Sequence, residues 1–306
     1  MIETLEKYEN VDLSSLTSLG IGGTAKCLVK PKNVNELQTL MEYIKKNNEK
    51  YYILGNGTNV ILDDTYFDGI IIKFDNFKDI SFDNNTVTVG SGVSLSYLAK
   101  VTLDNGFVSL NFASMIPGNV GGSVVGNAGC YGHELMEYVD KITVLDSDNN
   151  VKELSKDEIS FGYRYTSLKD RYIVLAVTFI LNRGDVSMAR EEVKQNNLKR
   201  VSSQPLDKKS VGSIFRNPEN ASAGKLIDDL GLKGKIIGGA CVSEKHANFI
   251  VNENNATFND MVSLINLIKK EVKEAYQLDL VTEPVIVKWD NLWSKKRSIR
   301  KSDLRH

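Results

Sequence analysis

Apolar residues recur along the chain at two spacings, one typical of helices and one typical of strands. Between residues 34 and 47 they repeat every three to four positions, with Asn33 as a plausible cap, which predicts an amphipathic helix. A second helix is predicted where Met261 to Val272 carry one apolar face, with Thr257 as its N-cap. Shorter apolar runs bounded by turn residues predict strands at 25–29, 51–54, 70–74, 86–89, 172–181 and 280–289.

Three further segments complete the predicted order of elements. Two alternating runs between residues 141 and 154 flank a polar cluster at 146–150, which predicts a β-hairpin. The acidic residues of this turn resemble half of a calcium-binding loop, but Val151 stands where that loop needs glycine, so we reject a calcium site. A short helix is expected around residues 95–101, and a charged helix at 188–200 leads out of a first domain that ends near Gly184.

Length and charge narrow the class of protein. The 306 residues correspond to about two domains of ~150 residues each. With 38 Lys and Arg against 39 Asp and Glu, the net charge of −1 provides no field that would hold a nucleic acid. Hydrophobic residues at 42% and charged residues at 25% are ordinary for a folded globular protein, so disorder and fibrous repeats are excluded.

The cysteines and the termini give no sign of a metal site or of export. Cys27, Cys130 and Cys241 are scattered and odd in number, so we expect no metal. The charged residues among the first ten leave no signal-peptide core, and the apolar run at 173–181 is far shorter than the ~20 residues of a membrane helix. The six basic residues between 295 and 305 could contact a phosphate or a membrane surface, although a solvated tail is favoured. We therefore expect a cytoplasmic protein.

Two glycine-rich segments are the first candidates for chemistry. Six glycines lie between residues 118 and 132, and a second cluster at 55–59 follows a predicted strand directly. Glycine lets backbone N–H groups approach a ligand closely, and successive N–H groups in a turn suit a pyrophosphate. Neither cluster matches a dinucleotide fingerprint or a P-loop, because Val60 stands where a third glycine is needed and no Gly-Lys-Ser/Thr triplet occurs. A phosphate-bearing ligand held by loops is favoured, and plain tight turns are the alternative.

Isolated polar residues add weaker signals. Arg164 is bracketed by Tyr163 and Tyr165, an arrangement that could hold a carboxylate or simply pack on a hairpin. Ser213 lacks the Gly-x-Ser-x-Gly surroundings of a serine hydrolase, which leaves a role as an acid open. His246 could be a general acid or base, but a structural histidine is favoured.

Taken in chain order, these motifs resemble the UDP-N-acetylenolpyruvoylglucosamine reductases, flavoenzymes of peptidoglycan precursor synthesis. The matching segments are 17–23, 54–59, 116–122, 127–129, 131–132, 163–164, 212–218, 245–252 and 283. The glycine-rich segments alone would indicate only the broader FAD-binding fold of vanillyl-alcohol-oxidase-like flavoproteins. Segments 212–218 and 245–249 point to the reductases themselves, in a short form that lacks an insertion in the substrate domain.

The resemblance implies an α+β fold. Residues 1–184 would form an FAD-binding domain of the vanillyl-alcohol-oxidase-like type, with subdomains at about 1–72 and 73–184. Residues 185–282 would form a smaller α/β substrate-binding domain, and residues 283–306 would return as a strand and tail toward the FAD domain. The implied activity is the reduction of UDP-N-acetylglucosamine enolpyruvate to UDP-N-acetylmuramate by NADPH, through non-covalent FAD.

The same resemblance assigns roles to individual residues. The implied catalytic residues are Arg164, Ser213 and Glu283. The implied FAD contacts are Leu54, Gly55, Asn56, Gly57, Thr58, Asn59, Pro117, Gly118, Asn119, Gly121, Gly122, Ser123, Asn127 and Gly129. The implied UDP-sugar contacts are Arg216 and Asn217, with Arg200 as a weaker candidate. We expect a monomer that binds the UDP-sugar and NADPH, with no nucleic acid partner and no membrane insertion.

Two other functions compete with this interpretation. A flavin oxidase would use oxygen to reoxidise the cofactor and could attach it covalently through Cys130 or His133. A non-enzymatic protein that binds UDP-sugars would have no need of the flavin segments, which makes it the weaker of the two.

Overall fold

The computed structural model describes residues 5–290, so the basic tail at 295–305 lies outside the described residues. The chain forms two compact units, each built from several segments. Among the described residues, the first unit comprises 5–8, 28–56 and 70–199, and the second comprises 9–27, 57–69 and 200–290. These units do not follow the boundaries expected near residues 184 and 282, because two early segments cluster with the C-terminal third of the chain.

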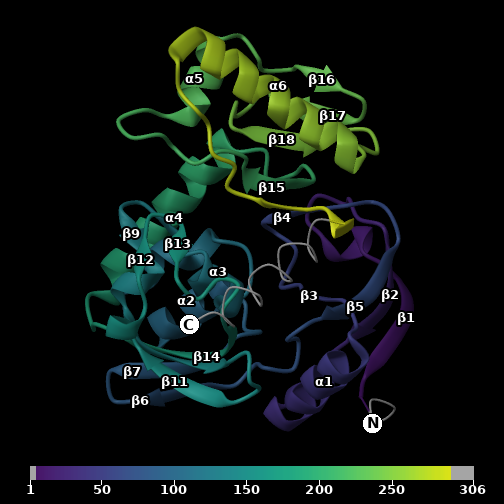
Figure 1. Ribbon diagram of the computed structural model, residues 1–306. Coiled ribbons are helices and arrows are strands. Elements are labelled where there is room, and N and C mark those ends of the chain that lie inside the picture. The colour runs from purple at the N-terminus through teal and green to yellow at the C-terminus, as the bar shows by residue number, and fades with distance from the viewer. Residues whose placement is uncertain (1–4, 291–306) are drawn as a thin grey trace. The chain divides into compact units, whose positions relative to one another are not determined.

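The largest sheet of the first unit has five antiparallel strands in the order β11-β10-β14-β7-β6. Strands β6, β7, β11 and β14 of this sheet are labelled in Figure 1. They are β6 (Ile80–Asp83), β7 (Thr86–Gly90), β10 (Val139–Leu145), β11 (Val151–Ser155) and β14 (Ile173–Ile180). The predicted hairpin is confirmed, since β10 pairs with β11 around the 146–150 turn. In that turn Asp146 Oδ1 accepts the N–H groups of Asp148 and Asn150 at 2.9 Å each, and its other oxygen pairs with Lys152.

Helices α2 (Leu95–Asp104) and α3 (Val120–Val125) belong to the core of this unit. The short helix predicted around residues 95–101 is therefore confirmed, whereas α3 lies in the glycine-rich segment and was not expected. Two small hairpins join the same unit. They are β8 (Gly129–Cys130) with β9 (His133–Glu134), and β12 (Phe161–Gly162) with β13 (Tyr165–Thr166).

A four-stranded sheet in the order β1-β2-β5-β3 contains the N-terminal strands. They are β1 (Lys7–Asp12), β2 (Thr24–Val29), β3 (Tyr51–Ile53) and β5 (Phe67–Ile72), and helix α1 (Val34–Asn47) connects β2 to β3. The prediction of α1 is confirmed with its cap, because Asn33 Oδ1 accepts the N–H of Glu36 at 3.0 Å. Strands β3 and β5 are parallel, so their carboxyl ends, at Leu54 and Lys73, lie at one edge of the sheet.

The second unit contains a four-stranded sheet in the order β15-β18-β17-β16. Its strands are β15 (Ser210–Ser213), β16 (Ile236–Ile237), β17 (Ala240–Val242) and β18 (Phe249–Asn252), and its helices are α5 (Ala223–Asp229) and α6 (Phe258–Tyr276). Helix α6 lies along this sheet (Figure 1) and buries the apolar face expected from the sequence. The predicted cap is also confirmed, as Thr257 and Asp260 form a capping box.

A parallel pair, β4 (Val60–Leu62) with β19 (Val285–Val287), belongs to the second unit. The strand expected over 280–289 is confirmed only in part. Pro284 has no backbone N–H, and the pairing is divided around it into an isolated bridge at Thr282 and the short strand β19. The buried residues Leu19, Ile21 and Ile61 share one apolar core with α6, which explains why the early segments join this unit.

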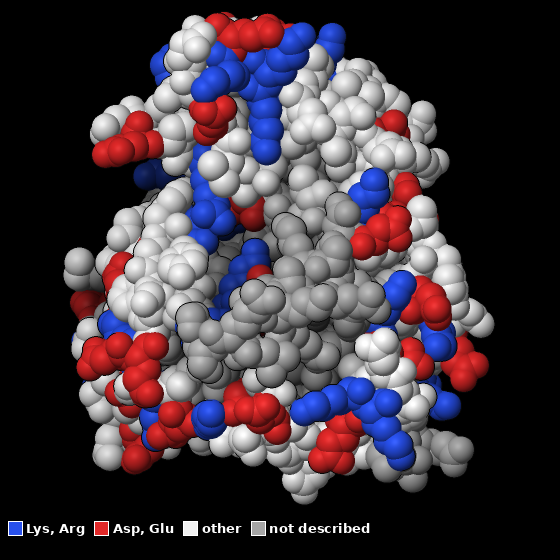
Figure 2. Space-filling view, viewed as in Figure 1, with Lys and Arg blue, Asp and Glu red and all other residues white. Residues whose placement is uncertain are grey.

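The remaining elements of the described part of the chain are a long helix and four short 3₁₀ helices. They are α4 (Val186–Ser203), η1 (Ser14–Leu16), η2 (Asn111–Met115), η3 (Leu135–Glu137) and η4 (Lys156–Glu158). Helix α4 confirms the predicted charged helix, and it passes from the first unit into the second. None of the helices among residues 5–290 is long and apolar enough to cross a membrane. Figure 2 shows acidic and basic side chains on the same face of the molecule, in keeping with the small net charge.

Candidate active site

Arg164 lies in the tight turn between β12 and β13, in the first unit. Its φ of 55° is in the left-handed region, which costs a non-glycine residue about 1–2 kcal/mol. The guanidinium donates to the backbone oxygens of Gly129 at 2.6 Å and Asn127 at 3.5 Å, and its Cζ lies 5.0 Å from the ring centre of Tyr163. These contacts hold the half-buried Arg164 in one place, and a guanidinium is the kind of group that binds carboxylates.

Ser213 and Glu283 lie in the second unit, on neighbouring backbone segments. Ser213 ends β15 and pairs with Phe249 of β18. The N–H of Glu283 donates to the carbonyl of Ile214, the residue after Ser213, at 2.9 Å. Two residues further on, the N–H of Val285 donates to the carbonyl of Asn59 at 3.0 Å. Segment 283–285 therefore joins the Ser213 strand to the end of the 55–59 turn.

The sequence did not point to Asn248, which fixes the backbone after Ser213. Asn248 is 4% exposed, and its amide accepts the N–H of Phe215 at 2.9 Å and donates to the Phe215 carbonyl at 2.8 Å. Its own carbonyl accepts the N–H of Ile214 at 2.8 Å. The motifs at 212–218 and 245–252 are thus two halves of one hydrogen-bonded assembly, and their co-occurrence in the sequence was the available signal.

The 118–122 turn contains glycines of two kinds. A Cβ on Gly121 would lie 2.8 Å from the Ser91 Cβ, and the Gly121 N–H donates to the Ser91 carbonyl at 3.0 Å. A Cβ on Gly122 would meet no atom within 4 Å, and the same holds for Gly55 in the other segment. Gly121 therefore serves internal packing, whereas Gly122 and Gly55 leave their backbone open to a ligand.

Buried polar atoms beside this turn provide a test of whether a polar cofactor fits. Within the described residues, Ser91 Oγ and Asn119 Oδ1 are buried and have no hydrogen-bond partner. Buried polar groups in proteins are paired almost without exception. Together with the open glycines, these two oxygens fit a ligand that carries several hydrogen-bonding groups, as FAD does.

A buried lysine supports the 55–59 segment from the sheet edge. Lys73 follows β5, is 7% exposed, and donates through Nζ to the Gly55 carbonyl at 3.0 Å. Burial lowers the pKa of Lys73, and the charge of Asp75, 3.8 Å away, opposes that effect. Sequence reasoning missed this residue, although a lysine directly after the apolar run Ile70 to Ile72 was a visible signal.

The proposed UDP-sugar contacts differ in how many of their atoms are used within the protein. The Nε of Arg216 is buried without a hydrogen-bond partner among residues 5–290, which suits an anionic ligand. Asn217 accepts the N–H of Ala223 at 3.1 Å, so one of the two lone pairs of its amide oxygen is used within the protein. Arg200, on α4, donates to the side chain of Gln204 at 2.8 Å.

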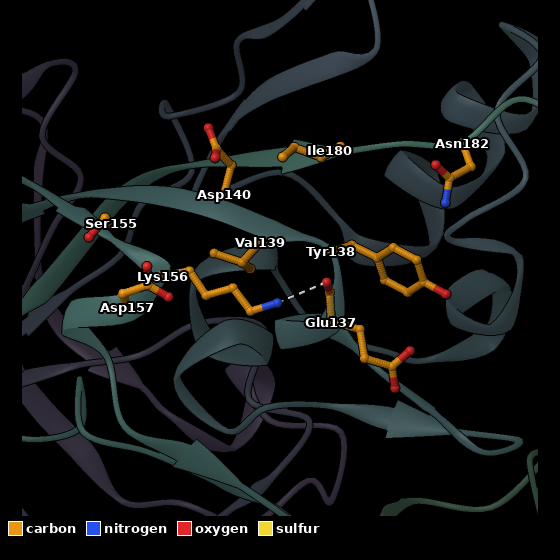
Figure 3. A pocket seen from close by; sticks show the side chains of 9 residues that line it. All are labelled: Glu137, Tyr138, Val139, Asp140, Ser155, Lys156, Asp157, Ile180 and Asn182. Atoms are coloured by element: carbon orange, nitrogen blue, oxygen red, sulfur yellow. Dashed lines mark hydrogen bonds between the residues drawn. The ribbon is translucent and has the colours of Figure 1, made fainter.

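A surface hollow of about 450 Å³ lies elsewhere in the first unit, between η3, β10, η4 and the end of β14 (Figure 3). Lys156 Nζ donates across it to the Glu137 carbonyl at 3.0 Å (Figure 3). None of the residues assigned to the flavin, the substrate or catalysis lines this hollow. It is therefore not the site under discussion.

Comparison with known proteins agrees with a flavin-binding fold. Residues 25–155 match a family model described as an FAD binding domain. Residues 204–287 match the C-terminal domain of UDP-N-acetylenolpyruvoylglucosamine reductase. Together with the paired glycine-rich segments, these matches define an FAD-dependent oxidoreductase with an α+β fold.

Relatives along nearly the whole chain specify the family. A UDP-N-acetylenolpyruvoylglucosamine reductase from Caldanaerobacter subterraneus subsp. tengcongensis is 41% identical over 281 residues, which cover 92% of this chain and 93% of the relative. One from Clostridium botulinum (strain 657 / Type Ba4) is 40% identical over 276 residues, 90% of each chain. The crystal structure of the reductase from Thermus caldophilus matches with a TM-score of 0.78 at 30% identity, covering 93% of this chain and 99% of that one. The chain belongs to the UDP-N-acetylenolpyruvoylglucosamine reductase family, which confirms the family and fold predicted from the sequence.

Proposed function

We propose that this protein reduces the enolpyruvyl group of UDP-N-acetylglucosamine enolpyruvate to give UDP-N-acetylmuramate, a peptidoglycan precursor, with NADPH as the hydride donor. The full-length relatives that support this proposal are reductases of the same name at 41% and 40% identity. They favour the reductase over the flavin oxidase, whose resemblance is confined to the FAD-binding fold. We further propose that the protein is a monomer and works in the cytoplasm.

Bound FAD supplies the hydride transfer, and the protein residues stabilise the charge and move the proton. Hydride addition at C3 of the enol ether builds negative charge at C2 and on the adjacent carboxylate. Arg164 stabilises this charge electrostatically, and Glu283, when protonated, donates a hydrogen bond to it. Ser213 Oγ then donates a proton to C2. Arg216 and Asn217, with Arg200 in a lesser role, bind the UDP-sugar.

The hydrogen bonds made by segment 283–285 are the observation that supports this assignment most directly. Glu283 lies 70 residues after Ser213 in the sequence, yet its N–H bonds to the residue that follows Ser213. The same segment bonds to Asn59, at the end of a turn assigned to the flavin. One backbone segment thus links the proposed proton donor, the proposed acid and a flavin contact.

The experiment separates the two halves of the reaction in the Ser213→Ala variant. NADPH is expected to reduce the flavin of this variant at the wild-type rate, since Ser213 has no part in that step. Reoxidation by the enolpyruvyl substrate is expected to slow by about 10²–10⁴-fold, the usual contribution of a general acid. Stopped-flow absorbance of the flavin under anaerobic conditions measures both rates.

Ser210→Ala is the matched control, because it makes the same change at the other end of β15. It is expected to leave both rates unchanged. Reoxidation of the Ser213→Ala variant at the wild-type rate would refute the role of Ser213. Wild-type protein whose flavin is reoxidised by oxygen but not by the enolpyruvyl substrate would instead support an oxidase.

A further inference from the structure

Asn127 is a fully buried residue at the centre of a hydrogen-bond network in the first unit. Its side-chain Nδ2 donates to Glu134 Oε2 at 2.8 Å and to the Gly162 carbonyl at 2.9 Å. Its Oδ1 accepts the N–H of Met136 at 3.1 Å. None of the Asn127 surface is exposed. One side chain therefore connects three segments of the unit.

This network changes the role expected for Asn127. The resemblance to the reductases assigned it to the flavin, but an amide has two N–H groups and both are engaged within the protein. Donating to a ligand would leave Glu134 or Gly162 without its partner, at a cost of about 1–3 kcal/mol. The side chain is thus committed to the protein itself.

The same residue contacts the Arg164 hairpin at two points. Its amide bonds to Gly162 on strand β12, and its backbone carbonyl accepts the Arg164 guanidinium at 3.5 Å. Because Arg164 adopts a left-handed φ of 55°, the turn keeps this conformation only if its surroundings hold it there. Thr166 Oγ1 donates to the Val125 carbonyl at 2.8 Å and anchors the other strand of the hairpin. Asn127 is therefore placed to determine where the guanidinium points.

We propose that Asn127 is a positioning residue, which orients Arg164 toward the carboxylate of the enolpyruvyl substrate by holding Gly162 and the guanidinium together. This inference rests on the proposed function, since it requires that Arg164 binds the substrate. It also gives a reason for an amide side chain two residues after helix α3, because the segment that holds the glycine-rich turn then also fixes the Arg164 hairpin.

The test is a double-mutant cycle with Asn127→Ala and Arg164→Ala. In otherwise wild-type protein, Asn127→Ala is expected to slow flavin reoxidation by the enolpyruvyl substrate by about 10²-fold, the effect of misplacing a reacting group by about 1 Å. Reduction by NADPH is expected to stay within about twofold of wild type. In the Arg164→Ala background, Asn127→Ala is expected to add less than about twofold, because there is no guanidinium left to position.

Binding gives a second readout that needs no turnover. Calorimetric titration of the oxidised protein with the enolpyruvyl substrate is expected to show the same dependence: a weaker Kd for Asn127→Ala alone and no further loss in the Arg164→Ala background. Glu134→Gln is the matched control, since it keeps an acceptor for Asn127 Nδ2 and leaves Gly162 and Arg164 untouched. It is expected to behave like wild type in both assays.

The outcomes distinguish the two proposals. An Asn127→Ala effect of equal size in both backgrounds, or one that falls equally on the NADPH step, would overturn the positioning role. If the Arg164→Ala variant reacts with the substrate at the wild-type rate, the proposed catalytic role of Arg164 is refuted, whatever the result for Asn127. Should Asn127→Ala not fold, Asn127→Asp combined with Glu134→Gln replaces it, because that pair keeps a hydrogen bond between positions 127 and 134 and replaces the donor to Gly162 with a carboxylate oxygen. Wild-type substrate binding by that pair would likewise overturn the inference.

Discussion

The two units hold their candidate catalytic residues in different ways, although each uses one buried asparagine. In the first, Asn127 holds a two-residue turn in which Arg164 is strained. In the second, Asn248 completes the strand pairing beside Ser213, and it bonds to Phe215 through both atoms of its amide. The second arrangement continues the pairing of β15 with β18 in a four-stranded sheet, whereas the first depends on a few contacts to a two-residue turn. We therefore expect the loss of the Asn248 side chain to affect folding, and the loss of the Asn127 side chain to affect function.

The largest effect on stability is expected from Asn248→Ala. This change leaves the N–H and the carbonyl of the buried Phe215 unpaired, and each costs about 1–3 kcal/mol. Thermal unfolding followed by circular dichroism should show a clearly lower Tm. Asn254→Ala changes an exposed asparagine of the same unit and is the control. Its Tm should equal that of the wild type. Equal Tm values for the two variants would mean that the strand does not depend on Asn248.

Alanine variants of the neighbouring Gly121 and Gly122 in the first unit are expected to affect folding and ligand binding separately. Gly121→Ala forces a Cβ against Ser91 and is expected to destabilise the protein by about 1–3 kcal/mol, as overpacking does. Gly122→Ala meets no atom and lies in helix α3, so the protein without FAD is expected to gain up to about 1 kcal/mol. If FAD approaches this backbone, Gly122→Ala should nevertheless bind FAD more weakly.

Unfolding of the FAD-free protein and fluorescence titration with FAD measure the two properties separately. Unchanged FAD affinity in Gly122→Ala would move the cofactor away from this turn. A Gly121→Ala variant as stable as wild type would show that the contact with Ser91 relaxes without cost.

How far the sequence could predict this molecule depends on the range of the interactions involved. Helices α1 and α6 were predicted with their caps, because Asn33 and Thr257 bond to residues three positions away. Helix α3 was missed because its glycines indicate a loop by local propensity, whereas Gly121 is required by its contact with Ser91. The roles of Asn127 and Asn248 could not be predicted, since their partners include backbone groups 35 and 33 positions away.

Backbone strain at Arg164 predicts a difference in stability between two variants, which is smaller than the effect of Asn248→Ala. It also tests whether the turn in the first unit is strained. Arg164→Gly and Arg164→Ala both remove the guanidinium, so both should lose activity with the enolpyruvyl substrate. Only glycine adopts a φ of 55° without strain, and Arg164→Gly is therefore expected to be more stable than Arg164→Ala by about 1 kcal/mol. Chemical denaturation of the two variants measures this difference. Greater stability of the alanine variant would show that the turn is not left-handed in solution.

The smallest expected effect is the pH dependence of stability that arises from His246 in the second unit. Burial lowers the pKa of His246 below its ordinary value; of the nearby charges, Lys233 lowers it further and Asp228 opposes this. The neutral ring accepts the Asn248 N–H through Nδ1 at 3.2 Å, and a proton on Nδ1 would remove that bond. The folded state therefore binds this proton more weakly than the unfolded state, whose histidine titrates near pH 6.5.

It follows that His246 contributes stability above about pH 6.5 and that this contribution is lost as the pH falls through the lower pKa of the folded state. His246→Asn keeps an acceptor close to the position of Nδ1 but does not titrate. The Tm of wild type is expected to fall more steeply between about pH 7.5 and pH 5 than the Tm of His246→Asn, measured at constant ionic strength. Parallel Tm profiles for the two proteins would mean that protonation of His246 does not weaken the hydrogen bonds around Asn248. The contribution of Asn248 to stability would then come from its two bonds to Phe215 alone.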